Sequence, residues 1–333
     1  MPLRVLYSAH PDYLDLARRA LEAALPEAEM ESLGGVDVAL LHIERRSLAE
    51  VADVCRATPI PFVRHLAAED VRVPTEDVPA SALERLQHHK LPIGLQVWAS
   101  GPVQARAEGI RASISERLAT AGIQTVRRDA AEVLAVCATP AGVSMGITDA
   151  ASMLCDWPGG RVRLRAGPEQ ISRSEFKLEE LIQLFPLDLR PATLALDLGA
   201  SPGGWTRILR TYAVDVVAVD PGDLDRRLRA DEGIRHERMT AGNYLRSSTA
   251  TFDLVVNDLR MDAERSARLM VDAAGKLKSG GRAVVTLKVT PRTARQDLAG
   301  ALRLLSSAYE LLFARQLHHN RNEITLVLQN LRQ

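Results

Sequence analysis

The chain has 333 residues, of which 46% are hydrophobic and 25% are charged, a composition typical of a soluble globular protein with two or three domains. Basic and acidic residues both number 42, so the formal net charge is zero and no overall positive field attracts nucleic acid. Any contact with a nucleic acid must therefore use a local basic patch.

Cysteine usage and the apolar segments limit the class of protein further. Cys55, Cys137 and Cys155 lie far apart, form no CxxC motif and are odd in number. This pattern argues against a zinc ribbon or a disulfide framework and fits a reducing compartment. The N-terminal segment meets an acidic residue before any long apolar region, and no apolar run approaches the length of a membrane span. We therefore expect a cytoplasmic protein.

The N-terminal half predicts two small modules that mix strands and helices. The first has a βαββαβ-like order, which suits an α+β domain over residues 1–75. Its predicted elements cover residues 4–9, 12–25, 36–44, 47–58 and 61–68. A proline-rich stretch at residues 72–81 then predicts a boundary.

A second alternation of strands and helices predicts another α+β module, over residues 76–160. Its predicted elements cover residues 94–100, 103–122, 124–129, 132–139 and 142–148. Residues 156–170 are rich in glycine, proline and arginine and predict a linker.

From residue 171 onward the pattern becomes regular and predicts a doubly wound parallel α/β sheet, which we assign to a domain over residues 161–333. The leading helix, residues 172–185, has Ser172 with Glu175 three positions later, a capping-box signature. The strands that follow are predicted at residues 193–199, 215–220, 252–258, 282–289 and 323–331, and the helices between them at residues 203–212, 223–230, 263–277 and 295–312.

Residues 194–209, LALDLGASPGGWTRIL, combine a strand, a glycine-rich turn and a helix, so the backbone can approach a ligand closely. They do not form GxGxxG: Asp197 would repel a pyrophosphate, and Pro202 removes an N–H group that a phosphate needs. A carboxylate here suits the positive end of S-adenosylmethionine (SAM). Asp220 ends the next strand, 21 positions after Gly199, the spacing of an acid that binds ribose hydroxyls. A packing turn and a dinucleotide dehydrogenase are the alternatives.

Arginine is the usual cation of this chain, since only five of its 42 basic residues are lysines. Lys288 nevertheless lies near the end of an apolar strand, and a buried lysine, unlike arginine, can lose its proton. Asp258 also falls at the carboxyl end of a predicted strand, where open α/β sheets bind ligands. Glu323 begins the last strand, so it reaches the same rim only if that strand is antiparallel to its neighbours.

Lys177 on the leading helix can join these three residues, which places two amines and two carboxylates in one cleft. Such a group can position a ribose hydroxyl, a weak nucleophile, and give its proton a destination. Taken singly, each residue also has a structural explanation. Lys288 can end its strand and reach water, and Lys177 can be a surface cation. Asp258 can form a turn, and Glu323 can pair with Arg321.

The motifs SRSEFKLEE, LDLGASPGGWT, VVNDL, TLKV and NRNEITLVL occur in the order of the FtsJ-like ribose 2′-O-methyltransferases, which the chain resembles. The resemblance implies that the family's Lys-Asp-Lys-Glu tetrad corresponds to Lys177, Asp258, Lys288 and Glu323. Within the family, VDPGDLDRRL, PGGRVRL and ARQLHHNRNEITL resemble the RlmM type, which methylates a cytidine ribose of 23S rRNA. This resemblance implies a Rossmann-like class I SAM methyltransferase domain with an antiparallel last strand. It also implies that a ferredoxin-like module and a THUMP-like RNA-binding module precede that domain.

The resemblance also implies SAM as the cofactor. The expected cofactor contacts are Asp197, Gly199, Ala200, Ser201, Pro202, Gly203, Gly204, Trp205, Asp220, Asn243 and Asp258. Two segments depart from the family pattern. MTAGNYL has no acid where the family often places one near the adenine, so the base contact passes to backbone groups or Asn243. NDLRMD replaces the commoner Asp-x-x-Pro after Asp258.

Four arginines precede the predicted catalytic helix: Arg161, Arg163, Arg165 and Arg173. On a strand the first three would share one face and could grip RNA phosphates, although a solvated face is the alternative. The expected partner is large-subunit ribosomal RNA or a precursor particle, bound by a monomer without a metal or a membrane. A ribosome-assembly factor that keeps the fold but not the chemistry is one alternative. A methyltransferase of another RNA, a protein or a small molecule is the other.

Overall fold

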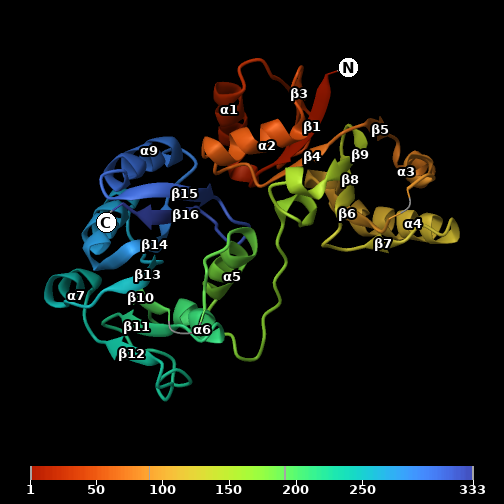
Figure 1. Cartoon of the computed structure of the whole chain (residues 1–333). Coiled ribbons are helices and arrows are strands. Elements are labelled where there is room, and N and C mark those ends of the chain that lie inside the picture. Colours follow the sequence, from red (N-terminus) through yellow and green to blue (C-terminus); the bar gives the residue numbers. More distant parts are fainter. Residues whose placement is uncertain (1, 90, 191–192, 332–333) are drawn as a thin grey trace. The chain divides into compact units, whose positions relative to one another are not determined.

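A computed structural model describes residues 2–89, 91–190 and 193–331 and divides the chain into two units, Met1–Val162 and Arg163–Gln333. The division falls within the stretch predicted as a linker. Figure 1 shows both units and labels most of their helices and strands. None of the helices in these ranges has the length and apolarity needed to cross a bilayer.

The first sheet of the N-terminal unit has four strands in the order β2-β3-β1-β4, and each neighbouring pair is antiparallel. Along the chain the order is β1-α1-β2-β3-α2-β4, the split βαβ connectivity of ferredoxin-like folds. The elements are β1 (Leu3–Ser8), α1 (Leu14–Ala24), β2 (Glu29–Ser32), β3 (Val38–Ile43), α2 (Leu48–Ala57) and β4 (His65–Ala68). The edge strand β2 was not predicted because its sequence, EMES, carries no apolar run.

The second sheet of this unit has the order β5-β9-β8-β6-β7. Its elements are β5 (Val71–Val73), α3 (Val78–Leu86), β6 (Ile93–Ala99), α4 (Arg106–Thr120), β7 (Thr125–Val126), β8 (Glu132–Thr139) and β9 (Gly142–Asp149). The proline-rich stretch 72–81 lies in β5 and the start of α3, where proline fits the first helical turn. Leu6, Trp98 and Ala135 belong to one buried cluster that joins both sheets, so the two sheets share a core.

The C-terminal unit contains a seven-stranded sheet with the order β12-β11-β10-β13-β14-β16-β15. Its strands are β10 (Leu194–Leu198), β11 (Asp215–Val219), β12 (Ile234–Glu237), β13 (Phe252–Asn257), β14 (Leu277–Lys288), β15 (Tyr309–Arg315) and β16 (Glu323–Asn330). Its helices are α5 (Glu175–Leu184), α6 (Gly204–Thr211), α7 (Ala241–Ser247), α8 (Ala263–Ala273) and α9 (Ala294–Leu305). The chain begins at a central strand, moves to one edge and then returns to the other, as a doubly wound sheet does.

The strand direction on which the predicted site depended is confirmed. Strands β10 to β14 are parallel, whereas β16 runs antiparallel to β14. In this register Lys288 and Glu323 are direct partners across the ladder. The carboxyl end of β14 and the amino end of β16 therefore lie at the same rim of the sheet.

The helix predicted at residues 223–230 was wrong, because this segment forms turns. Leu224 and Leu228 have helical spacing and are both buried, which explains the prediction. Asp225, however, accepts a hydrogen bond from the backbone N–H of Arg227 at 3.0 Å, and this local bond competes with a helix. The polar segment that follows contains the short strand β12, which the sequence pattern did not predict.

The helix predicted at residues 295–312 was also too long. Helix α9 ends at Leu305, and the chain returns as strand β15 after Ser306 and Ser307. Tyr309 on β15 is buried, and its hydroxyl donates a hydrogen bond to the carbonyl of Met270 at 2.7 Å. This tertiary packing overrides the helical spacing of the apolar residues.

A buried carboxylate ties α5 to the loop that leads into β16. Glu180 accepts hydrogen bonds from the backbone N–H groups of His318 at 2.6 Å and His319 at 2.9 Å. The ring of His319 makes a third contact, 2.7 Å from Nδ1 to Oε2 of Glu180. Because Lys177 lies one turn earlier on α5 and Glu323 follows the loop, this contact fixes the two residues relative to each other.

We predict that Glu180→Ala lowers the free energy of unfolding by about 3 kcal/mol, because it leaves buried N–H donors without their charged acceptor. Urea unfolding of the full chain, followed by circular dichroism, measures the change. Glu179→Ala, one position earlier on the same helix, is the control and should change stability by less than about 1 kcal/mol. Equal losses in the two variants would contradict this assignment.

Candidate active site

Four charged side chains meet at the rim of the sheet where β14 ends and β16 begins. Lys177 comes from α5, Asp258 follows β13, Lys288 ends β14 and Glu323 begins β16. The Nζ atom of Lys177 lies 3.0 and 3.1 Å from the two oxygens of Asp258 and 2.5 Å from Oε2 of Glu323. The structure thus brings together the four residues that the sequence placed at one site.

Lys288 contacts the same two carboxylates from the other side. Its Nζ donates a hydrogen bond to Oε1 of Glu323 and lies 3.3 Å from Oδ1 of Asp258. Thr286 completes this network, since its hydroxyl donates to Asp258 and lies 3.5 Å from Nζ of Lys288. The sequence reasoning missed Thr286. Its position two residues before Lys288, on the same face of the strand, was the signal that could have identified it.

The two positive and two negative charges of this cluster balance, and the four side chains are largely shielded from water. The side chains of Lys177, Asp258 and Glu323 are only 14–15% exposed, and that of Lys288 is 24% exposed. Burial opposes the charge on Lys177, but the fields of Asp258 and Glu323 outweigh it and raise the pKa of the amine above its usual value. Lys177 is therefore a fixed cation that holds the two carboxylates together.

Asp197 lies near the carboxyl end of β10, the strand next to β13 in the sheet. Its side chain is buried, and the hydroxyl of Thr206 donates to its Oδ2 at 2.7 Å. Burial raises the pKa of Asp197 to about 7, and the hydrogen bond from Thr206 only partly opposes that shift. A cation bound beside Asp197 would stabilise its ionised form.

The glycine-rich loop between β10 and α6 is shaped by two glycines in the left-handed region. Gly199 has φ +81°, and a Cβ there would lie 2.3 Å from Leu259. Gly203 has φ +113°, and a Cβ there would lie 2.3 Å from Leu228. Both positions therefore need glycine for packing as well as for conformation. This explains the turn without a ligand, so the glycines alone are not evidence for a cofactor.

The other loop residues are placed by local contacts. Ala200 is buried, Pro202 follows Ser201, and Gly204 begins α6. The hydroxyl of Ser201 donates to the carbonyl of Asp223 at 2.8 Å. The Trp205 ring lies in the core, and its Nε1 donates to the carbonyl of Ser174 at 2.9 Å, so it anchors the start of α5.

The acids at the strand ends fit SAM by their chemistry. Asp220 follows β11, is half-buried and accepts a hydrogen bond from the N–H of Gly222 at 2.7 Å, which orients its carboxylate. Buried Asp197 suits the positive methionyl end, and Asp220 suits ribose hydroxyls. Asn243 is exposed on α7, and its Oδ1 accepts a hydrogen bond from Arg246.

The arginines predicted to bind RNA do not share a strand, because residues 161–167 form none. Arg161 belongs to the N-terminal unit, where its guanidinium pairs with Asp37 and donates to the carbonyl of Ala99 at 3.0 Å. This arginine is therefore used for structure, and the prediction that it shares a phosphate-gripping strand face was wrong. Arg163, Arg165 and Arg173 are exposed.

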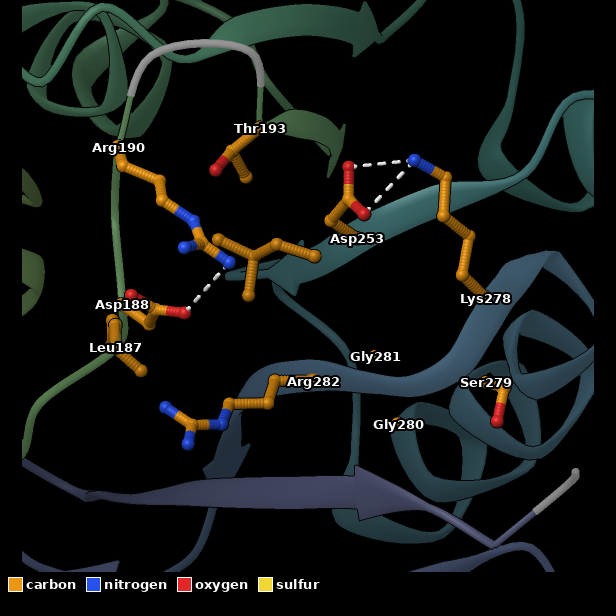
Figure 2. A pocket seen from close by; sticks show the side chains of 11 residues that line it. Leu187, Asp188, Arg190, Thr193, Asp253, Lys278, Ser279, Gly280, Gly281 and Arg282 are labelled. Atoms are coloured by element: carbon orange, nitrogen blue, oxygen red, sulfur yellow. Dashed lines mark hydrogen bonds and ion pairs between the residues drawn. The ribbon is translucent and has the colours of Figure 1, made fainter.

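Two hollows of the C-terminal unit lie at opposite ends of the sheet. One, of about 400 Å³, lies at the amino ends of β10, β13 and β14, and Figure 2 shows its side chains. Two ion pairs lie within it, Lys278 with Asp253 at 2.9 Å and Arg190 with Asp188 at 3.4 Å, and Arg282 donates to the carbonyl of Pro186 at 2.6 Å. The other is a groove of about 580 Å³ beside the four charged residues. Its lining residues are Arg260, Met261, Asp262, Lys288, Val289, Thr290, Asp297 and Glu323.

Metal chemistry has no evident ligand set here. Over residues 2–89, 91–190 and 193–331, no group of three histidine, cysteine, aspartate or glutamate side chains is arranged to hold a metal ion.

Comparison with known proteins gives the chain a family. The FtsJ-like methyltransferase family matches residues 170–323. The ribosomal RNA large subunit methyltransferase M of Alkalilimnicola ehrlichii is 34% identical over 280 residues, which cover 79% of this chain and 76% of that protein. The protein of the same name from Halorhodospira halophila is 36% identical over 173 residues, 51% of this chain and 50% of that protein.

Among solved structures, TrmN from Thermus thermophilus is 19% identical, with a TM-score of 0.38 over 99% of this chain and 100% of that chain. The family assignment depends on the 280-residue match and on the FtsJ-like segment. The chain belongs to the FtsJ-like, SAM-dependent methyltransferases, in the family of the ribosomal RNA large subunit methyltransferase M.

Proposed function

We propose that this protein methylates the 2′-hydroxyl of a ribose in large-subunit 23S rRNA, and that the acceptor is a cytidine. The observation that carries the proposal is the cluster of two lysines and two acids, which opens through Lys288 and Glu323 into the groove of about 580 Å³. The name of the relatives supports ribosomal RNA as the substrate class. The cytidine comes from the resemblance of the motifs alone.

We infer that the residues at the carboxyl ends of β10 and β11 hold the cofactor. Asp197 and Asp220 are the carboxylates there, and the loop Gly199–Trp205 passes beside them. When bound, SAM supplies an electrophilic methyl group. The chain's own contribution is to align the acceptor oxygen with that methyl group, and such alignment accounts for much of a rate enhancement.

Lys288 is the residue that we assign to the acceptor hydroxyl. During transfer a new bond forms between the oxygen and the methyl carbon, the carbon–sulfur bond breaks, and the hydroxyl proton must leave. Lys288 faces the groove and touches both Asp258 and Glu323, so it can orient the hydroxyl and take or pass on its proton. Lys177 stays charged and keeps the two acids in place.

We predict that Lys288→Ala reduces methyl transfer by about a thousandfold or more while the affinity for SAM changes little. Lys288→Arg should fail nearly as badly, because a guanidinium orients a hydroxyl but does not accept its proton. Lys278→Ala is the matched control: Lys278 is on the same strand but pairs with Asp253 at the other end of the sheet. Transfer of labelled methyl groups to RNA measures all three, and normal turnover by Lys288→Ala would refute the role.

Incubation with labelled SAM and unmodified large-subunit RNA tests the substrate. We expect label at one position that resists alkaline cleavage, because a methylated 2′-oxygen cannot attack the adjacent phosphate, and we expect a cytidine there. Label on a base would contradict the proposed reaction. SAM binding without any labelled RNA would favour a non-catalytic RNA-binding factor.

The affinity for SAM should rise by about tenfold between pH 6 and pH 8. The pKa of Asp197 is raised to about 7 by burial, so the free protein holds a neutral carboxyl below that pH and must ionise it to bind a cation. Because the pKa is raised on folding, this group's contribution to stability is fully present below about pH 4 and is lost as the pH rises from there to about 7. Calorimetric titration measures the affinity. Asp197→Asn should bind weakly with little pH dependence, and a wild-type affinity that is flat with pH would contradict this role.

A further inference from the structure

We propose that Arg260 binds a backbone phosphate of the RNA next to the acceptor ribose. This inference rests on the proposed function, and it concerns a residue to which neither the family pattern nor the four-residue cluster gives a role. Arg260 lines the groove of about 580 Å³ together with Lys288 and Glu323.

The backbone that carries Arg260 is held firmly on both sides. Before it, Asn257 is fully buried, and its Oδ1 accepts a hydrogen bond from the N–H of Leu259 at 2.9 Å. The side chain of Leu259 packs so closely on Gly199 that a Cβ there would overlap it. After it, Asp262 caps α8 by accepting from the N–H of Arg265 at 2.9 Å. The position of Arg260 is therefore fixed before any ligand arrives.

The side chain of Arg260, in contrast, is not engaged. It is exposed, and among the described residues it makes no hydrogen bond or ion pair. Neighbouring arginines are used differently: Arg265 pairs with Asp262 at 3.3 Å, and Arg268 pairs with Glu264 at 2.7 Å. A guanidinium held at the edge of a groove without a carboxylate partner is available to an anionic ligand.

The charges of the groove favour a phosphate on the Arg260 side. Glu323 is balanced by the two lysines, and Asp262 is occupied by its helix cap and Arg265. Asp297, on the first turn of α9, is the acid that would repel a phosphate, so it directs the phosphate away from that wall.

The lining between these charges suits the rest of a nucleotide. Met261 is half-buried and presents apolar surface, and the exposed Thr290 adds a hydroxyl. A ribose whose hydroxyl points to Lys288 carries phosphates on either side, and the planar guanidinium of Arg260 can bind one of them through two parallel hydrogen bonds. Phosphate contacts of this kind fix the register of an RNA but do not read its bases.

Steady-state kinetics with RNA as the varied substrate test the proposal. We expect Arg260→Ala to raise the KM for RNA by about tenfold with kcat within about twofold, as the loss of one charged contact predicts. The negative slope of log(kcat/KM) against log salt concentration should become shallower by about 1. Arg260→Lys should recover part of the affinity, because it keeps the charge but not the two-bond geometry.

Arg303→Ala is the matched control, since Arg303 is exposed on α9 and does not line the groove. The proposal is overturned if Arg260→Ala and Arg303→Ala behave alike, or if Arg260→Ala lowers kcat without changing the KM for RNA. It is also overturned if the affinity for SAM falls, which would mean that Arg260 binds the carboxylate of the cofactor instead. Activity of Lys288→Ala separates the two claims: turnover in that variant refutes the proposed function, whereas an inactive Lys288→Ala beside an unaffected Arg260→Ala refutes only this inference.

Discussion

The antiparallel pairing of β16 with β14 is the constraint on which the site depends. In a purely parallel sheet, the first residue of the last strand would lie at the opposite rim from the last residue of its neighbour. Here Lys288 and Glu323 are direct partners across the ladder, although 35 positions separate them in the chain. Hydrogen bonds between main-chain groups thus bring an amine and a carboxylate into contact, and the direction of one strand decides whether the cluster exists.

Side-chain contacts outside the cluster make this arrangement more rigid. Glu180 ties α5 to the loop before β16, and Glu175 at the start of the same helix accepts from Nε of Arg207 on α6 at 3.0 Å. Leu259 connects the loop after β13 to the glycine turn at Gly199. The helix of Lys177, the loop of Asp258 and the strand of Glu323 are therefore held in place by contacts outside the cluster as well as within it. Such support matters because catalysis by alignment tolerates little displacement.

The sequence correctly predicted those helices and strands whose pattern of apolar residues matches their burial in the structure. The apolar runs of β13, β14 and β16 were recognised, and the ends of these strands located Asp258, Lys288 and Glu323, whereas Lys177 was placed by the leading helix. Prediction failed where a local bond or tertiary packing decided the structure, as in the turns at residues 223–230 and in β15. Arg161 shows the same limit, because its partner Asp37 is 124 positions away. Glu180 acts through contacts with His318 and His319, which spacing along its own helix does not reveal.

A double-mutant cycle on Lys288 and Glu323 tests the central claim most directly, namely that these residues work as one group. Methyl transfer to RNA is measured for the wild type, Lys288→Ala, Glu323→Gln and the double variant. Residues that act as a unit give strongly non-additive losses, so the account predicts that the double variant is barely slower than the worse single one. Rate losses that simply multiply would mean that the two residues act separately, and this would contradict the account.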